Sequence, residues 1–321
     1  MPGSWDVWRI LREIDLEAVR KESELPFRVQ VVAENERDAG ALAAILCGAS
    51  DGRPHPAVQP SVAVLGPPPR PLPDVAIALS RGSELAPRLA LAAETLARAR
   101  VPVVTVVVGG GLLDGVVRPG EAARAAVPAL DRRHAPAIAQ ALVSAAPTQL
   151  RLALARQLPP LRPALMAALV EQTARANALY ALGTGVAEAV PLLSLPLNLA
   201  DILVLTKNQL VMAYRIALAG GRSGSVRDVL GQTVGVVGSG FLLRQLARQL
   251  VGLVPVIGIA PKVAVAYAGT WAVGRAVAAW ANGGPQVSAA AVKRFYAEAL
   301  ERGRQVSASL VSRARRGRSR K

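Results

Sequence analysis

The sequence predicts an α/β domain followed by an all-α, hydrophobic helical domain, and two observations carry this prediction. Short, continuous apolar runs in the first half alternate with segments of helical period, which is the pattern of a parallel sheet built from βαβ units. In the second half the apolar segments are longer and follow the helical period. We expect strands at 27–32, 60–66, 73–80 and 101–109, and helices at 39–48, 83–100, 164–182, 199–219 and 287–310.

Prolines mark the boundary between the two domains. Pro159, Pro160 and Pro163 interrupt a helical pattern, because proline removes a helical hydrogen bond and clashes with the preceding turn. We therefore divide the chain at 158–159. The expected parts are an amphipathic N-terminal helix (1–25), a degenerate G-like α/β domain (26–158), the helical domain (159–310) and a basic disordered tail (311–321).

Composition limits the partners and the covalent chemistry. Of 321 residues 52% are hydrophobic but only 3% aromatic, and the formal net charge is +16. Such a charge attracts anionic surfaces, but the chain has no aromatic platform or reader motif, so we expect no specific nucleic acid as a partner. Cys47 is the only cysteine, which excludes a disulfide or a thiolate zinc site within one chain.

The first strand leads into a loop and a helix, where a phosphate-binding GxxxxGK[ST] loop would lie. Ala33 and Asp38 occupy its two glycine positions, Ala39 its lysine position and Gly40 its hydroxyl position. The tight amide-lined turn, the cation that neutralises phosphate and the magnesium ligand are all missing. We therefore expect a P-loop GTPase-like parallel sheet without catalytic residues, cofactor or metal ion, and no enzymatic activity.

The helical domain supplies the candidate structural or interaction residues. A helix over 199–219 is expected to begin at Asn198 as its cap and to stop at Gly220 and Gly221. Asp201 lies in its first turn, where a carboxylate suits the helix dipole. The alternative for Asp201 is an intramembrane carboxylate. The candidates are Asn177, Pro191, Pro196, Asp201, Lys207, Asn208, Gln209, Tyr214, Pro255, Gly258, Lys262 and Trp271.

Residues 229–281 are the candidate for lipid, and their second part, 251–281, is apolar nearly all round; a helix of this kind is either central in a bundle or in lipid. Lys262 and Arg275 oppose lipid, because each costs about 2.5–3.5 kcal/mol at the centre of a bilayer. A hairpin formed by 229–243 and 251–274 would keep both basic flanks on the cytoplasmic side. Shallow insertion is equally compatible with the pattern.

The helical half resembles the YcjF-like family, known as domain of unknown function 697. The resemblance covers roughly residues 160–305 and implies a helical domain that often follows a G domain of the Era and dynamin-like class, in proteins frequently described as membrane proteins. GTP binding is not carried over, because this chain departs from the G-domain pattern at every nucleotide-binding position. The matching features are Arg175-Ala-Asn-Ala, Pro191, Pro196, Asp201, the LTKNQLVMAYRIAL segment (205–218), VPVIGIAPK (254–262) and the Gly269–Gly274 run.

Three functions remain after these observations. The first is a non-enzymatic, membrane-associated scaffold or regulatory protein, at the cytoplasmic face of a bacterial inner membrane, either peripheral or inserted as a hairpin. The second is a soluble, cytoplasmic interaction module whose partner is another protein, such as a true GTPase, or a second copy of the chain. The third, a functioning GTPase, lacks the loop lysine and hydroxyl that its chemistry needs.

Overall fold

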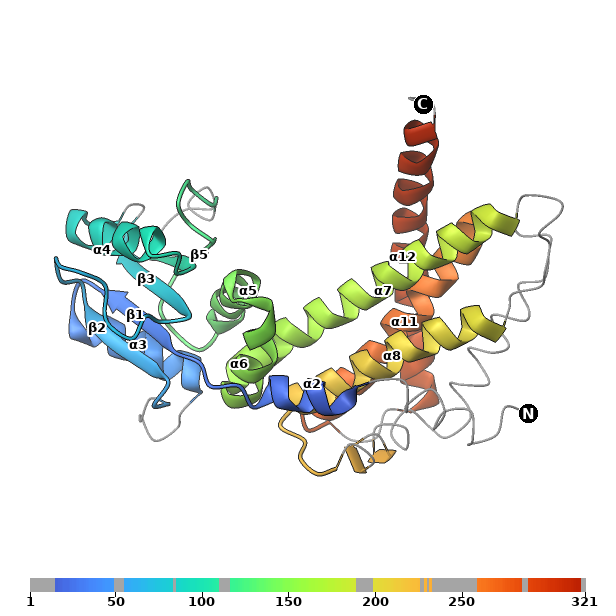
Figure 1. Cartoon of the computed structure of the whole chain (residues 1–321), viewed down its shortest axis with the longest axis horizontal. Helices are drawn as coiled ribbons and strands as arrows, with labels where there is room; N and C mark the ends of the chain where they lie inside the picture. Colours follow the sequence, from blue (N-terminus) through green and yellow to red (C-terminus); the bar gives the residue numbers. More distant parts are fainter. Residues whose placement is uncertain are drawn as a thin grey trace. The chain divides into compact units, whose positions relative to one another are not determined.

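The computed structural model describes residues 15–48, 55–82, 85–109, 116–188, 199–225, 228–229, 231–232, 259–284 and 288–318. Two compact units make up the chain (Figure 1). One, Lys21–Leu165, is the α/β unit. The other, the helical unit, comprises Met166–Lys321 together with the N-terminal residues to Arg20. The border thus lies a few residues after the expected 158–159, inside a long helix that begins at Arg162.

The α/β unit holds five parallel strands in the order β2-β1-β3-β4-β5. This order is one of the common doubly wound arrangements. The strands are β1 (Val29–Ala33), β2 (Val58–Val62), β3 (Val75–Arg81), β4 (Val103–Val108) and β5 (Ala123–Val127). Both predicted parts of the fold, a parallel α/β sheet and a helical region after it, are confirmed.

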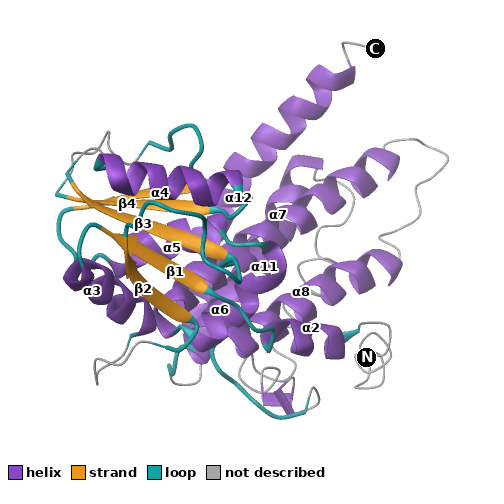
Figure 2. Ribbon diagram, turned by 60° about the vertical axis from the view of Figure 1, so that its left-hand side comes forward, coloured by secondary structure: helices purple, strands orange, loops and turns teal. Residues whose placement is uncertain are grey.

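Helices cover the sheet on both faces. On one face, α4 (Pro87–Arg98) packs Leu89 and Leu96 against Val32, Ala78 and Val103 of the strands. On the other face, α3 (Glu36–Cys47) contacts β1 and β2, and α5 (Ala135–Ala145) contacts β4 and β5; Figure 2 shows α4 and α3 on opposite sides of the sheet. The unit ends with η2 (Thr148–Leu150), α6 (Arg151–Gln157) and η3 (Pro159–Leu161).

The connection between β2 and β3 contains no helix, and the strand residues explain why none is needed. Gln30 and Val32 share the face on which α4 packs, because alternate residues of a strand point the same way. Ser61, the register partner of Val32, accepts a hydrogen bond from Gln30 Nε2 at 3.1 Å. This end of the face therefore carries polar side chains and offers little apolar surface for a helix to cover.

The helical unit is built around α11 (Ile259–Ala281), most of whose residues are buried. It packs against α8 (Leu199–Ala219) and α12 (Ala289–Arg318). Gly274 allows a close approach, because a Cβ there would lie 2.5 Å from Val170 Cγ2 of α7 (Arg162–Glu188) and 3.1 Å from Met212 of α8. α11 is therefore packed among helices of its own unit.

The predicted end of α8 is confirmed by its hydrogen bonds. Gly221 adopts φ +85°, its N–H donates to the Leu218 carbonyl at 2.9 Å, and the Arg222 N–H donates to the Ala217 carbonyl at 3.1 Å. These two bonds form a Schellman motif, which needs a left-handed residue such as glycine. The glycine pair ends α8 for this conformational reason.

Two local predictions differ from the structure, and a third is tested only in part. Residues 311–318, expected to be disordered, continue α12 to Arg318. A strand, β5, occupies Ala123–Val127, where we expected none. Of the expected N-terminal amphipathic helix, the described part is α2 (Leu16–Ser23), and residues 1–14 lie outside the described range.

Candidate functional site

The candidate site of the α/β unit is the carboxyl edge of the sheet between β1 and β3. From β1 the chain moves to β2 on one side, and from β3 it moves to β4 on the other, so the strand order reverses between these two strands. Open α/β sheets bind ligands in the crevice at such a switch point. The loop after β1 and the last residue of β3 form this part of the edge.

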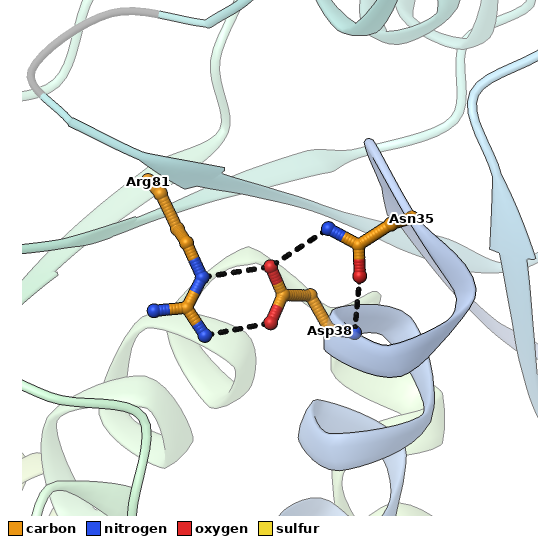
Figure 3. A network of polar contacts seen from close by, with 3 residues as sticks. All are labelled: Asn35, Asp38 and Arg81. Atoms are coloured by element: carbon orange, nitrogen blue, oxygen red, sulfur yellow. Dashed lines mark hydrogen bonds and ion pairs between the residues drawn. The ribbon is translucent and has the colours of Figure 1, made fainter.

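The loop after β1 is very short and leads directly into α3. Only Glu34 and Asn35 separate the last residue of β1 from the first residue of α3. Asn35 caps the helix, since its Oδ1 accepts a hydrogen bond from the Asp38 N–H at 2.9 Å. Its Nδ2 donates to Asp38 Oδ2 at 3.1 Å, so the cap also fixes the aspartate side chain (Figure 3).

The Asp38 carboxylate is held from the other side by Arg81, the last residue of β3. Arg81 Nε donates to Oδ2 at 2.8 Å and a terminal guanidinium nitrogen donates to Oδ1 at 2.7 Å (Figure 3). The Asp38 side chain is 10% exposed and that of Arg81 62%. Hydrogen bonds from Arg81 outweigh the effect of burial and lower the pKa of Asp38 below its usual value.

This geometry puts an internal anion at the start of α3. The N-terminus of a helix attracts negative charge because its first N–H groups have no partner in the helix. Asp38 lies in the first turn and supplies that charge, while Arg81 supplies the cation that would otherwise face a ligand. The switch point thus holds a charge-compensated, bidentate ion pair.

The positions compared with a phosphate-binding loop lie in regular structure. Ala33 ends β1 with its side chain fully buried, and Asp38, Ala39 and Gly40 all lie within α3. A P-loop instead needs several residues of loop between its two glycines. The two residues between β1 and α3 cannot form such a loop.

In the helical unit, predicted candidates from two helices meet in one buried polar network with α11. Asn177 of α7 is fully buried, and its Nδ2 donates to Thr270 Oγ1 at 2.9 Å. Asn208 Nδ2 of α8 donates to Asn177 Oδ1 at 2.7 Å, and Gln209 Nε2 donates to Thr270 Oγ1 at 3.1 Å. Thr270 Oγ1 donates in turn to the Ala266 carbonyl at 2.9 Å. The network ties α7, α8 and α11 together at one level.

Four further candidates lie on α8 and α11. Trp271 is buried on α11 under the guanidinium groups of Arg275 and Arg302, each 5.3 Å from its ring centroid. Tyr214 is fully buried in α8. Lys207 and Lys262 are half-buried. The side chain of Asp201 and the predicted sites at Pro191, Pro196, Pro255 and Gly258 lie outside what the structure describes.

No family model, characterised protein or solved structure matches the chain. The resemblance to the YcjF-like family therefore stays a prediction. Among the helices that the structure describes, none combines the length and apolar character needed to cross a bilayer. Within the same described ranges, no group of three or more metal-ligating side chains comes together.

The sequence analysis did not identify the residues to which its candidate residues are hydrogen-bonded. Arg81 follows directly on the buried run of β3, and a polar residue at the carboxyl end of such a strand is a signal that could have drawn attention. Thr270 is the only hydroxyl residue of α11 besides Tyr267, in an otherwise apolar run. Glu121 and Arg124 form a third unexpected pair, at 2.8 Å, with side chains 10% and 1% exposed.

Proposed function

We propose that the protein is a non-enzymatic scaffold or regulatory protein. The observation that carries this proposal is the Asp38–Arg81 ion pair. In nucleotide-binding α/β proteins the crevice at the switch point is kept open for the ligand's phosphates. Here the Asp38 carboxylate lies at the start of α3, and the Arg81 guanidinium is already bound to it.

The energetics favour this state over a bound phosphate. A nucleotide phosphate would approach the Asp38 carboxylate, and like charges at close range repel by several kcal/mol where water is partly excluded. To bind at Arg81, the phosphate would have to displace a bidentate ion pair that Asn35 also holds in position. The β1–α3 connection is only two residues long, which is shorter than a phosphate-binding loop.

A nucleotide titration of the full chain tests the proposal. GTP or ATP with Mg²⁺ is titrated into the wild type and into Arg81→Gln while heat is measured. We expect no saturable binding by either protein. Micromolar binding to the wild type would overturn the proposal, and its loss in Arg81→Gln would identify Arg81 as a phosphate ligand.

For location, we propose peripheral association with the cytoplasmic face of a membrane rather than a membrane-inserted hairpin. The support is α11, which falls in the second arm of the hairpin considered from the sequence and is buried among α7, α8 and α12. A helix with such protein neighbours needs no lipid around it. The positive charge of the chain favours an anionic surface.

Cell fractionation distinguishes these possibilities. A peripheral protein sediments with membranes at low salt and is released by carbonate. Recovery in the soluble fraction at low salt would contradict the membrane proposal, and release by detergent alone would favour the hairpin.

A soluble interaction module is the second candidate, and one feature favours it. Val64 and Leu65 lie two and three residues after the end of β2, at the carboxyl edge, and are 74% and 56% exposed. Two adjacent exposed aliphatic side chains suit contact with another protein. If Val64→Asp with Leu65→Asp left every co-purifying protein and the oligomeric state unchanged, this candidate would lose its support.

A further inference from the structure

The last turns of α12 extend beyond the helix on which α12 packs. Ser307 Oγ donates to the Ala260 carbonyl at 2.7 Å, and a Cβ on Gly303 would lie 2.6 Å from the Ala264 carbonyl oxygen. The two helices are therefore antiparallel, and α11 begins at Ile259, next to its contact with Ser307. α12 continues to Arg318, about three turns further. Figures 1 and 2 both show this end of α12 beyond its neighbouring helices.

This end of α12 is strictly basic. Arg304 is ion-paired with Glu301 at 3.0 Å, but after Glu301 the chain has no acidic side chain. From residue 302 to the last residue it has eight cationic residues: Arg302, Arg304, Arg313, Arg315, Arg316, Arg318, Arg320 and Lys321. α11, the helix alongside, contains Lys262 and Arg275 and no acidic residue either. Cations favour the C-terminus of a helix, but that effect is limited to the last turn. It does not account for a run of this length.

The helix also carries an apolar strip in the same region. Val306, Leu310 and Val311 recur at helical spacing and are half-exposed. A helix with a basic face and aliphatic residues on the other side is typical of one that lies at a lipid interface. After Tyr296 the chain has no aromatic residue, so it offers no platform on which nucleic-acid bases could stack.

We propose that the C-terminal part of α12, residues 302–318, docks on the surface of an anionic lipid bilayer. The inference rests on the proposed peripheral membrane association and names the contact that provides it. Arginine side chains bind the lipid phosphates and carboxylates, and Leu310 and Val311 contact the boundary of the acyl chains. Each basic residue near such a surface adds about 1 kcal/mol of attraction, so several together give measurable binding.

Vesicle flotation of the full chain tests this contact. Vesicles of phosphatidylcholine mixed with phosphatidylserine should carry the wild type upward at low salt, and vesicles of phosphatidylcholine alone should not. The variant R313E/R315E/R316E/R318E should bind the anionic vesicles at least about 100-fold more weakly. The control R70E/R88E/R100E/R133E makes the same change in net charge at exposed arginines of the α/β unit and should bind like the wild type.

The outcomes separate this inference from the proposed function. Equal flotation of the α12 variant and the wild type would overturn the role of α12 and leave membrane association standing. If the wild type sedimented with cell membranes but did not bind the anionic vesicles, the lipid contact of α12 would likewise be wrong and membrane association would still stand. Tighter binding to an RNA or DNA duplex than to anionic vesicles would assign the basic helix to nucleic acid and overturn the inference. If the glutamate variant does not fold, glutamine at the same four positions neutralises the charge and keeps helix propensity.

Discussion

Replacement of Asn177 by alanine should destabilise the helical unit by about 2–4 kcal/mol. Asn177 is fully buried and makes two side-chain hydrogen bonds, to Thr270 at 2.9 Å and from Asn208 at 2.7 Å. Losing them costs about 1 kcal/mol each, and the unmet Asn208 donor and the small cavity add about 1–2 kcal/mol. Thr270 keeps its bond from Gln209, which limits the loss on that side.

Tryptophan fluorescence during urea unfolding measures this loss selectively. All four tryptophans lie outside the α/β unit, and two of them, Trp271 and Trp280, are in α11. Asn208→Ala is the comparison variant: it removes one of the two bonds but leaves the fully buried Asn177 Oδ1 without its donor, so it should cost about 1–3 kcal/mol. An Asn177→Ala protein that unfolds within about 0.5 kcal/mol of the wild type, the range of a neutral surface substitution, would refute the network as a stabilising element.

Three further predictions concern packing and charge. Gly274→Ala should lower the free energy of unfolding by about 1–3 kcal/mol, measured by tryptophan fluorescence, because its Cβ would lie 2.5 Å from Val170 Cγ2. The control Gly183→Ala places its Cβ where nothing lies within 4 Å and should be neutral or stabilising. Arg124→Met should destabilise the α/β unit by about 3–5 kcal/mol, because it leaves the buried Glu121 carboxylate without its ion pair. Amide hydrogen exchange measures this loss, and the double variant with Glu121→Gln should recover part of it. Burial raises the pKa of Glu121, but its bonds to Arg124 and the Arg118 N–H outweigh this and lower it overall. The Glu121–Arg124 pair therefore contributes its full stability above the unfolded-state pKa of glutamate, about 4.3, and loses it as the pH falls through the lower folded-state pKa. If the amide protons of β5 were protected from exchange equally well at low and at neutral pH, this prediction would be wrong.

The elements that the sequence predicts well are those in which local pattern and tertiary role agree. β4 is a continuous run of β-branched residues, and all six are buried in a central strand. α8 runs from Leu199 to Ala219, as its helical spacing and the glycine pair predict. β5 was missed because three of its five residues are alanine and its second residue, Arg124, is charged; Arg124 is buried only because it pairs with Glu121. Glu121 lies three positions before Arg124 and outside the strand, so the strand propensity of β5 carries no trace of this pairing.

In the candidate sites too, local features can be predicted from the sequence and long-range contacts cannot. The loss of the phosphate-loop residues at Ala39 and Gly40 is visible in the sequence, but the role of Asp38 is not. Its partner Arg81 is 43 positions away, and only the parallel pairing of β1 with β3 brings the two ends together. Likewise, Asn177 was a candidate because it lies in the Arg175-Ala-Asn-Ala stretch, while its bond to Thr270, 93 positions away, depends on how α7 packs against α11.

The central claim is that Asp38 fills the switch point as an internal anion held by Arg81. Titration of the Asp38 side-chain carboxyl carbon by NMR tests it directly, in the wild type and in Arg81→Gln. The account predicts a pKa below the usual value of 3.8 in the wild type and a clear rise in the variant, because the Arg81 hydrogen bonds are the largest cause of the lowered pKa. An ordinary pKa in the wild type, unchanged by Arg81→Gln, would contradict it.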